Sequence, residues 1–323
     1  DLQLPPYTLT SQRFSSIIDS SVGQVLAVVF PDFGPIEAWP VDNSTSAPLC
    51  VVAHGHLTVN EVYVDGAAYT SGSVLYPWAE QQGIDLLGAP YTAVKFSGGT
   101  GTFDGEGGEK VYVSLKDGPT SGQIVEVVRR LVENHTTLGF PGSNDFMFSR
   151  AQARAGNLLG RAAANASGSS NVKTLNFIEG TLLETFPMIS MAWWGGGYGP
   201  IYTDRRDNTV SAKLVAEQWP ILHRASRVVE TPRTECFNNF SLHYDYDALN
   251  NEYRKYTERT PANSTMCEFS RRSVGERHAD PMESLYINDD AMAEKVLDWL
   301  VSHQTLPSHD VTYAVTPAFA LSV

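Results

Sequence analysis

Short apolar segments, each about as long as one β-strand, recur through the first 120 residues of the chain. Two of them, Gln24–Phe30 and Leu49–Ala53, are almost continuously apolar, which is typical of strands buried on both faces of a sheet. Three further segments have a strand-like pattern: Glu61–Asp65, Tyr91–Phe96 and Lys110–Leu115. The last two flank the glycine-rich segment Gly98–Gly108, which we interpret as the loop of a long hairpin.

Helical periodicity begins after residue 119. A helix that starts at Thr120, with Gln123 completing a capping box, places four apolar residues on one face: Ile124, Val127, Val128 and Leu131. A second helix is expected from Ser143 or Asn144 towards Ala163. Later patterns predict strands at 172–178 and 311–315, a helix at 211–223 that Pro220 breaks or kinks, and an amphipathic helix at 290–303.

Strands and helices intermix, so the fold class is α/β or α+β, and periodicity alone does not choose between them. We expect a mixed sheet with flanking helices and an irregular, glycosylated region near residues 230–281. The Ser-, Gly- and Asn-rich stretch Asn165–Asn171 marks a soft boundary. The expected organisation is an N-terminal α/β half, 1–168, and a C-terminal half, 169–323, packed as one globular unit.

The charge balance of the chain argues against two classes of partner. With 23 basic and 36 acidic residues the formal charge is −13, so electrostatics oppose binding to nucleic acid and to anionic membrane surfaces. No apolar run approaches the roughly 18 residues that span a bilayer. We therefore expect an acidic protein with no nucleic-acid partner and no membrane span.

Glycosylation motifs point to a secreted protein whose signal peptide has been removed. Five Asn-x-Ser/Thr sequons occur, at Asn43, Asn134, Asn165, Asn239 and Asn263. Cys236 and Cys267 flank two of these sequons, and a disulfide between them would close a loop of about 30 residues and contribute roughly 3–4 kcal/mol. Cys50 lies in an apolar run and is expected to be a free buried thiol.

The segment HGHLTVNEVYVDG places His54 and His56 two residues apart, followed by Glu61 and Gly66. On a strand both imidazoles would point the same way and could reach one metal ion. The segment resembles the first half of the cupin signature, and the resemblance covers about 13 of 323 residues. It implies a metal held by His54, His56 and Glu61, although Pro48 stands where the family has a glycine and no second motif supplies a fourth ligand.

A second constellation follows the predicted strand at 172–178. Glu179 would stand at the end of that strand, where α/β enzymes place acid/base groups. The loop beyond it carries Trp193, Trp194 and Tyr198 among glycines, which suits stacking against a sugar ring. Asp204 is the candidate for the second carboxylate of a general acid/base pair.

The favoured function at this point is a secreted glycoprotein hydrolase acting on a glycan or other small extracellular molecule, with Glu179 and Asp204 as catalytic groups. One alternative is a metal-dependent oxidoreductase or lyase that uses His54, His56 and Glu61. The other is a non-catalytic carbohydrate-binding protein. The cofactor is unknown, a divalent metal at His54 and His56 is not favoured, and the oligomeric state is unknown.

Overall fold

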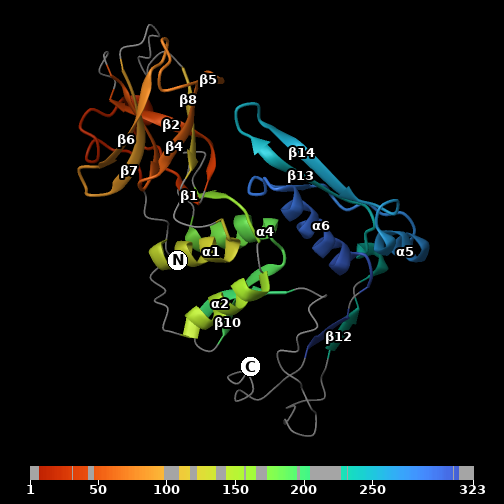
Figure 1. Ribbon diagram of the computed structural model, residues 1–323. Coiled ribbons are helices and arrows are strands. Elements are labelled where there is room, and N and C mark those ends of the chain that lie inside the picture. Colours follow the sequence, from red (N-terminus) through yellow and green to blue (C-terminus); the bar gives the residue numbers. More distant parts are fainter. Residues whose placement is uncertain are drawn as a thin grey trace. The chain divides into compact units, whose positions relative to one another are not determined.

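The computed structural model in Figure 1 describes residues 7–30, 32–42, 47–97, 109–116, 122–135, 143–155, 158–164, 173–194, 197–203, 227–230, 232–307 and 309–312. The chain forms two compact units. The first comprises Asp1–Gly139, Asn157–Leu182 and Asp247–Glu252, and the second comprises Phe140–Gly156, Leu183–Tyr246 and Tyr253–Val323. Each unit takes residues from both of the expected halves, 1–168 and 169–323, and the packing of those halves as one globular unit stays a prediction. Strands and helices are mixed, as expected, and β-structure predominates.

The first unit is built on a seven-stranded sheet, drawn in red to orange in Figure 1. Its strands are β2 (Phe33–Asp42), β3 (Leu49–His54), β4 (Thr58–Val64), β5 (Ala67–Tyr69), β6 (Trp78–Ile84), β7 (Pro90–Phe96) and β8 (Val111–Lys116). They lie in the order β5-β4-β8-β2-β3-β7-β6, and every neighbouring pair is antiparallel. Strands β3, β4, β7 and β8 confirm four of the sequence-based expectations.

The interpretation of Gly98–Gly108 as a hairpin loop was wrong, although those residues themselves lie outside the described part. Strands β7 and β8 are not neighbours, because β2 and β3 lie between them. A hairpin was expected because the two strand patterns follow each other in sequence. Strand pairing is instead set by which strands place their apolar faces together on the interior of a strongly curved sheet.

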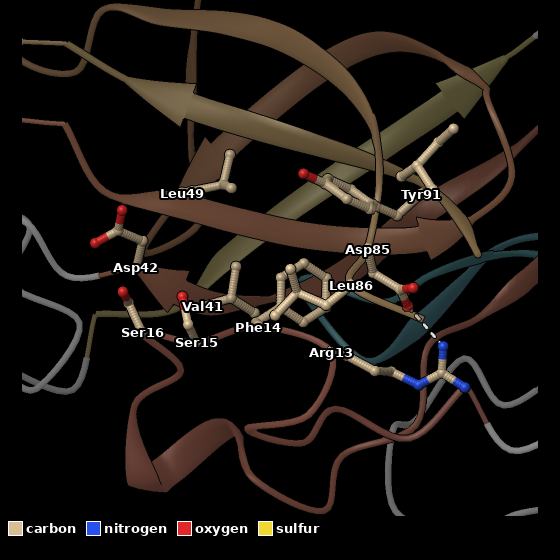
Figure 2. Close-up of a pocket in the computed structure, with 11 residues that line it drawn as sticks. Arg13, Phe14, Ser15, Ser16, Val41, Asp42, Leu49, Asp85, Leu86 and Tyr91 are labelled. Atoms are coloured by element: carbon tan, nitrogen blue, oxygen red, sulfur yellow. Dashed lines mark hydrogen bonds and ion pairs between the residues drawn. The ribbon is translucent and has the colours of Figure 1, made fainter. Parts of the chain in front are cut away.

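An N-terminal segment covers the outer face of β2, β3 and β7. Leu9 and Leu26 pack there with Val41, Val51 and Ala93 in one buried cluster. Phe14 meets Tyr91 edge to face, with ring centroids 5.2 Å apart. Figure 2 shows Phe14 lying close to Val41 on this face. The run Leu49–Ala53 is therefore buried on both sides, as its continuous apolar sequence predicts.

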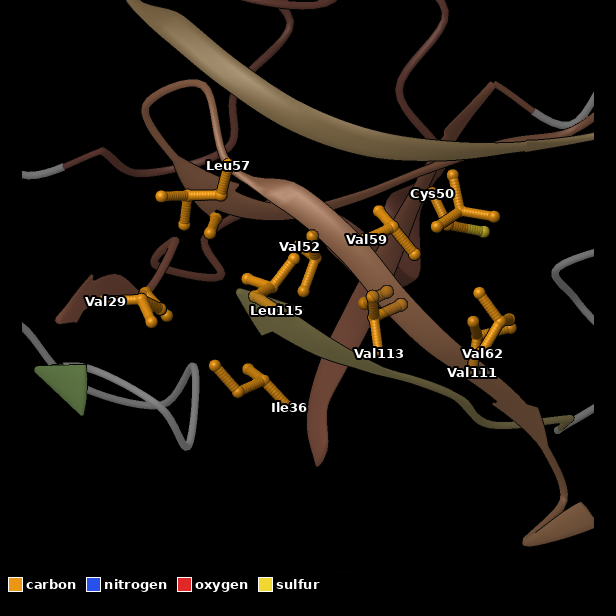
Figure 3. Packing of buried hydrophobic residues seen from close by; sticks show 14 of the residues in the cluster. Val29, Ile36, Cys50, Val52, Leu57, Val59, Val62, Val111, Val113 and Leu115 are labelled. Atoms are coloured by element: carbon orange, nitrogen blue, oxygen red, sulfur yellow. The ribbon is translucent and has the colours of Figure 1, made fainter. Parts of the chain in front are cut away.

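The other face of the sheet encloses the larger core. Alternate residues of β8 point inward, and those of β2, β3, β4 and β7 meet them. Figure 3 shows this packing for a set of residues that share the interior: Val29, Ile36, Cys50, Val52, Leu57, Val59, Val62, Val111, Val113 and Leu115. Almost all are branched aliphatic side chains, which fill the interior of a small curled sheet well.

Local irregularities curve the sheet into a half-barrel. Register shifts interrupt the pairing of β2 with β3 and with β8, of β3 with β7, and of β4 with β8. Such bulges increase twist and bend the strands that carry them. At one of them Gly34 lies so close to β8 that a Cβ atom would stand 2.5 Å from Ser114 Cα, so only glycine fits there.

Side chains of β6 connect the two ends of this curled sheet. Glu80 Oε2 accepts a hydrogen bond from Val59 N on β4 at 2.8 Å, and Trp78 Nε1 donates to Tyr69 O on β5 at 2.7 Å. Gln82 Nε2 donates to Leu57 O at 3.1 Å. We call these contacts the seam. They give backbone groups of β5, β4 and the segment before β4 side-chain partners from the end strand at the other side of the sheet, β6.

Helices and a small second sheet complete the first unit. Strand β1 (Val28–Phe30) pairs with β9 (Ala162–Ala164), so the run Gln24–Phe30 is buried but is not a central strand of the main sheet. A 3₁₀ turn, η1, covers Asp19–Ser21. Helix α1 (Ile124–His135) buries the face that the sequence predicted.

The strand expected at 172–178 was wrong, because this segment is helical. It consists of α3 (Thr174–Phe177), a π-helical turn η2 (Ile178–Leu182) and α4 (Leu183–Thr185), with α4 assigned to the second unit. Its buried residues Ile178, Leu182 and Phe186 recur every four positions, which is helical spacing. A seven-residue segment with four apolar residues was too short to separate the two periods.

The second unit contains helices and short sheets. Besides α4, its helices are α2 (Ser143–Ala155), α5 (Thr265–Val274) and α6 (Asp290–Gln304), with a 3₁₀ turn η3 at Arg233–Glu235. Its strands are β10 (Ile189–Trp194), β11 (Gly197–Tyr202), β12 (Arg227–Glu230), β13 (Phe240–Asp247), β14 (Glu252–Arg259), β15 (Met282–Glu283) and β16 (His309–Thr312). Helix α6 confirms the helix expected at 290–303. The helix expected at 211–223 lies outside the described residues.

The expectation of an irregular region near 230–281 was wrong. Phe240, Leu242 and Tyr244 alternate inward along β13, which lies between β14 and β15. Helix α5 follows, with the Ser264 side chain accepting a hydrogen bond from Cys267 N as its N-cap. The polar residues of this region are therefore the exposed faces of regular elements.

The predicted disulfide does not form. Cys236, Cys267 and Cys50 are all buried free thiols. Burial raises the pKa of the Cys236 and Cys267 thiols, so both stay protonated and behave as small apolar side chains. The expectation for Cys50 is confirmed.

The seam can be tested at Glu80. Replacing Glu80 with Ala should lower the free energy of unfolding by about 1 kcal/mol, because Val59 N–H loses its acceptor at a nearly buried position. Glu80→Gln keeps an oxygen that can accept the same hydrogen bond and should cost less than half as much. Urea unfolding followed by tryptophan fluorescence compares the two variants. Equal decreases in the free energy of unfolding would argue against a stabilising role for the hydrogen bond between Glu80 and Val59 N–H.

Candidate functional site

The structure does not bring the predicted metal ligands together. Strand β3 ends at His54, and Gly55 has a φ of +93°, so the strand alternation that would align His54 with His56 is broken. The His54 ring stacks on Tyr7 with centroids 3.4 Å apart, and His56 Nε2 lies 3.2 Å from Gly83 O. Glu61 accepts a hydrogen bond from the Tyr63 hydroxyl. In the described residues no group of three or more His, Cys, Asp or Glu side chains is placed to hold a metal.

The predicted acid/base and stacking residues are placed only in part. Glu179 is exposed on the π-helical turn rather than at the end of a strand, and Asp204 lies outside the described residues. Trp193 and Tyr198 face each other in the register of the β10–β11 hairpin, and Trp194 faces Gly197. The roles assigned to these residues stay predictions.

The sequon asparagines have different surroundings. Asn134 lies on α1 and is exposed, and Asn263 is exposed in the turn before α5, where its side chain binds Thr260 N and Glu258 O. Asn239 is half-buried, and its side-chain nitrogen donates to Asn238 Oδ1 and Arg277 O. Asn43 and Asn165 lie outside the described residues.

Two hollows of the described surface bear on the search for a site. One, of about 530 Å³, lies in the second unit beside α5 and α6. Its one cation is Arg259, which already pairs with Asp298 at 2.9 Å and so joins β14 to α6. This hollow is explained by the packing of those elements.

The other hollow, of about 200 Å³, lies in the first unit between the N-terminal segment and the β6–β7 loop (Figure 2). We refer to it as the N-terminal hollow. Its lining is mixed in character: Arg13, Phe14, Ser15, Ser16, Val41, Asp42, Leu49, Ile84, Asp85, Leu86 and Tyr91. One cation and two carboxylates belong to it, so the lining is nearly neutral although the chain as a whole carries −13.

A partly buried ion pair holds one wall of the hollow. Arg13 Nη1 donates to Asp85 Oδ2 at 2.6 Å, and the two side chains are 16% and 5% exposed (Figure 2). The backbone adds a second link, because Leu86 N donates to Arg13 O. These two bonds join the β6–β7 loop to the N-terminal segment.

Asp85 also fixes the shape of the loop, Asp85–Ala89. Its Oδ1 accepts hydrogen bonds from Leu87 N and Ala89 N, both at 2.9 Å. Asp85 N donates to Ala89 O, and Gly88 N donates to Asp85 O. Every backbone N–H from Asp85 to Ala89 therefore has a partner, and the turn is ordered without help from its other side chains.

The electrostatics of Asp85 follow from these contacts. Burial acts to raise the pKa of Asp85, but hydrogen bonds from Ala89 N–H, the Arg13 guanidinium and Leu87 N–H outweigh it, so the pKa is lowered. Burial, together with the Asp85 charge, raises the pKa of Tyr91 in the floor of the hollow. The carboxylate is thus ionised, and the phenol is neutral, at ordinary pH.

The last residue of β6 and the ordered loop after it present three large apolar side chains to solvent. Ile84, Leu86 and Leu87 are 66%, 68% and 58% exposed, and we call them the apolar knob. Contiguous exposed apolar side chains on a rigid support are a feature of interaction surfaces. The signal of this surface in the sequence is the pair of adjacent leucines in the turn segment IDLLGAP.

Comparison with known proteins adds information on the fold alone. No family model matches the sequence, and no curated protein matches it. A chain from a solved structure titled "Virion of native gene transfer agent (GTA) particle" is similar in fold, with a TM-score of 0.53. The two are 11% identical, and the match covers 98% of this chain and 81% of that chain.

These findings correct the expectation of a secreted, extracellular protein with a disulfide, whereas the hydrolase function and the glycosylation stay predictions. The structural neighbour is a chain of a virion particle rather than a secreted enzyme, and the three cysteines are free thiols. The expectation rested on three-residue sequons, which also arise by chance. In the part of the chain that the structure describes, no helix has the length and apolar character needed to cross a bilayer.

The Arg13–Asp85 pair should make stability depend on pH in a specific direction. Because folding lowers the pKa of Asp85, its contribution is present above about pH 4 and is lost as pH falls through the lowered value. At pH 7, Asp85→Asn should reduce the free energy of unfolding by about 2–3 kcal/mol, since Arg13 is left without its carboxylate.

Urea unfolding of wild type and Asp85→Asn from pH 7 down to pH 3 measures this effect. The difference in the free energy of unfolding between wild type and Asp85→Asn should become smaller at the acidic end of the series. Asp19→Asn, at an exposed acid, serves as the matched control and should change little at any pH. A constant difference over the whole range would contradict the assigned role of Asp85.

Proposed function

We propose that this chain is a structural protein of a virion or virion-like particle, acting through contacts with other protein subunits. The observation that carries the proposal is the similarity in fold to a chain of the gene transfer agent virion over 98% of this sequence. A match of this extent takes in both compact units, so the resemblance is not confined to one common supersecondary motif.

The first unit has the properties that such a role requires. Its core is closed by the seam, and its outer face is covered by the N-terminal segment held through Arg13 and Asp85. A subunit of this kind keeps its shape while it is bound by neighbours, which limits the entropy that assembly must overcome. The apolar knob then supplies exposed apolar area for a protein contact.

The decisive measurement is whether the chain sediments together with particles. An antibody against the purified chain is used to follow it in lysates of the organism that encodes it, separated on a density gradient. We expect the chain in the fast-sedimenting fraction, at a fixed ratio to the other particle proteins and unchanged by nuclease treatment. Recovery of the whole pool among slowly sedimenting soluble proteins would overturn the proposal.

A further inference from the structure

We propose that strand β14 is a salt-sensitive strap, which ion pairs close onto α6 and which opens while the apolar core of the second unit stays packed. Strand β14 lies at the end of its sheet, with β13 as its neighbour. None of its eight side chains is buried, whereas those of Phe240, Leu242 and Tyr244 on β13 are. Apolar packing therefore holds β13 in place, and β14 depends on other contacts.

Helix α6 supplies those contacts through a stripe of three carboxylates. Asp290, Glu294 and Asp298 recur every four residues, so they lie on one face of the helix. Carboxylates at this spacing repel one another, and the charge of −13 on the whole chain adds to the repulsion. The stripe is therefore stabilised by a neighbouring strand that carries positive charge.

Two cations of β14 meet this stripe. Lys255 Nζ donates to Asp290 Oδ1 at 2.8 Å, and Arg259 Nε donates to Asp298 Oδ1 at 2.9 Å. Arg259 Nη2 also lies 3.8 Å from Glu294 Oε2. Residues four positions apart on a strand share a face, so Lys255 and Arg259 reach the helix from the same side of β14. All three carboxylates of the stripe thus have a cation from this one strand.

The two ends of the strap are held differently. Tyr253, near the start of β14, packs against Tyr246 with ring centroids 5.1 Å apart, and its side chain hydrogen-bonds Glu283. At the other end, Arg259 and Asp298 line the hollow of about 530 Å³ beside α5 and α6. Water and dissolved ions can therefore reach this ion pair, and we expect opening to begin at Arg259.

Salt distinguishes the strap from the core beneath it. Raising the ionic strength from about 0.01 M to about 1 M shortens the screening length from roughly 30 Å to 3 Å, which weakens ion pairs in contact with solvent. Screening does not weaken the apolar packing of α6, whose Val296, Leu297 and Val301 are buried. High salt should therefore open β14 and uncover the edge of β13 while α6 stays packed.

Hydrogen–deuterium exchange of the purified full chain, followed by mass spectrometry, tests the inference. Between about 10 mM and about 1 M sodium chloride, the backbone amides of β14 should exchange at least about threefold faster, and those of α6 should not. This series uses wild type, so it does not depend on the folding of a variant. An equal response in β14 and α6, or no response in β14, would overturn the inference.

Substitution of the cations gives a second measurement. In dilute salt, Arg259→Gln should speed exchange in β14, and added salt should change its exchange less than in wild type. Lys255→Gln should act in the same direction by a smaller factor, because Lys255 and Asp290 are more exposed than Arg259 and Asp298. Arg259→Lys restores a cation and should restore part of the salt dependence.

A matched control removes a cation that does not contact the strap. Arg271 pairs with Glu268 at 2.8 Å within helix α5, so Arg271→Gln makes the same change in net charge as Arg259→Gln. Exchange in β14 should stay as it is in wild type. If Arg271→Gln speeds it as much as Arg259→Gln does, net charge and not the ion pairs controls the strand, and the inference fails.

This inference goes beyond the proposed function and does not rest on it. Exchange is followed in the purified chain, whereas the structural role is judged from particle fractions. A strap that fails to respond to salt would leave the proposed function intact, and absence of the chain from particles would leave the strap intact.

Discussion

The first unit depends on how the two ends of a curled antiparallel sheet are joined. Seven strands bend through four register shifts, but no eighth strand in the described chain joins β6 to β4 and β5. Trp78, Glu80 and Gln82 close this gap with side-chain hydrogen bonds to backbone atoms. The closure encloses a core of branched aliphatic residues, because the interior faces of all the long strands then point towards one another.

The position of the knob follows from that closure. Strand β6 is held at its start by Trp78 and along its length by Glu80 and Gln82, so the chain leaves it at Ile84 in a fixed direction. Asp85 then turns the backbone back into β7 and binds Arg13 of the covering segment. The β6–β7 loop thus connects the seam to the N-terminal segment that covers the sheet. A change in any of them is expected to move the knob, because each supplies contacts that orient the same few residues.

The features that could be predicted from sequence are those set by neighbouring residues. The run Leu49–Ala53 is buried on both faces and reads correctly as a strand, and the periodic face of α1 reads correctly as a helix. The seam joins residues up to 25 positions apart, such as Gln82 and Leu57, and leaves no local pattern. His54 and His56 failed as a pair for a local reason that the sequence does not display, since Gly55 adopts a positive φ and ends the alternation. Asp85 reads as an ordinary turn residue until Arg13, 72 positions away, is placed beside it.

The exposed leucines are the part of this arrangement that folding does not require. Every backbone N–H of the β6–β7 loop is satisfied by Asp85, by Arg13 O or by the loop itself, so polar side chains at positions 86 and 87 would be compatible with the same turn. Solvent-exposed leucine adds little to stability and lowers solubility. Exposed leucines in an otherwise ordinary surface turn are, under the function we propose, positions for a contact with another subunit. The exposure of Leu86 and Leu87, beside a hollow on the same patch, is better explained by protein association than by packing within the chain.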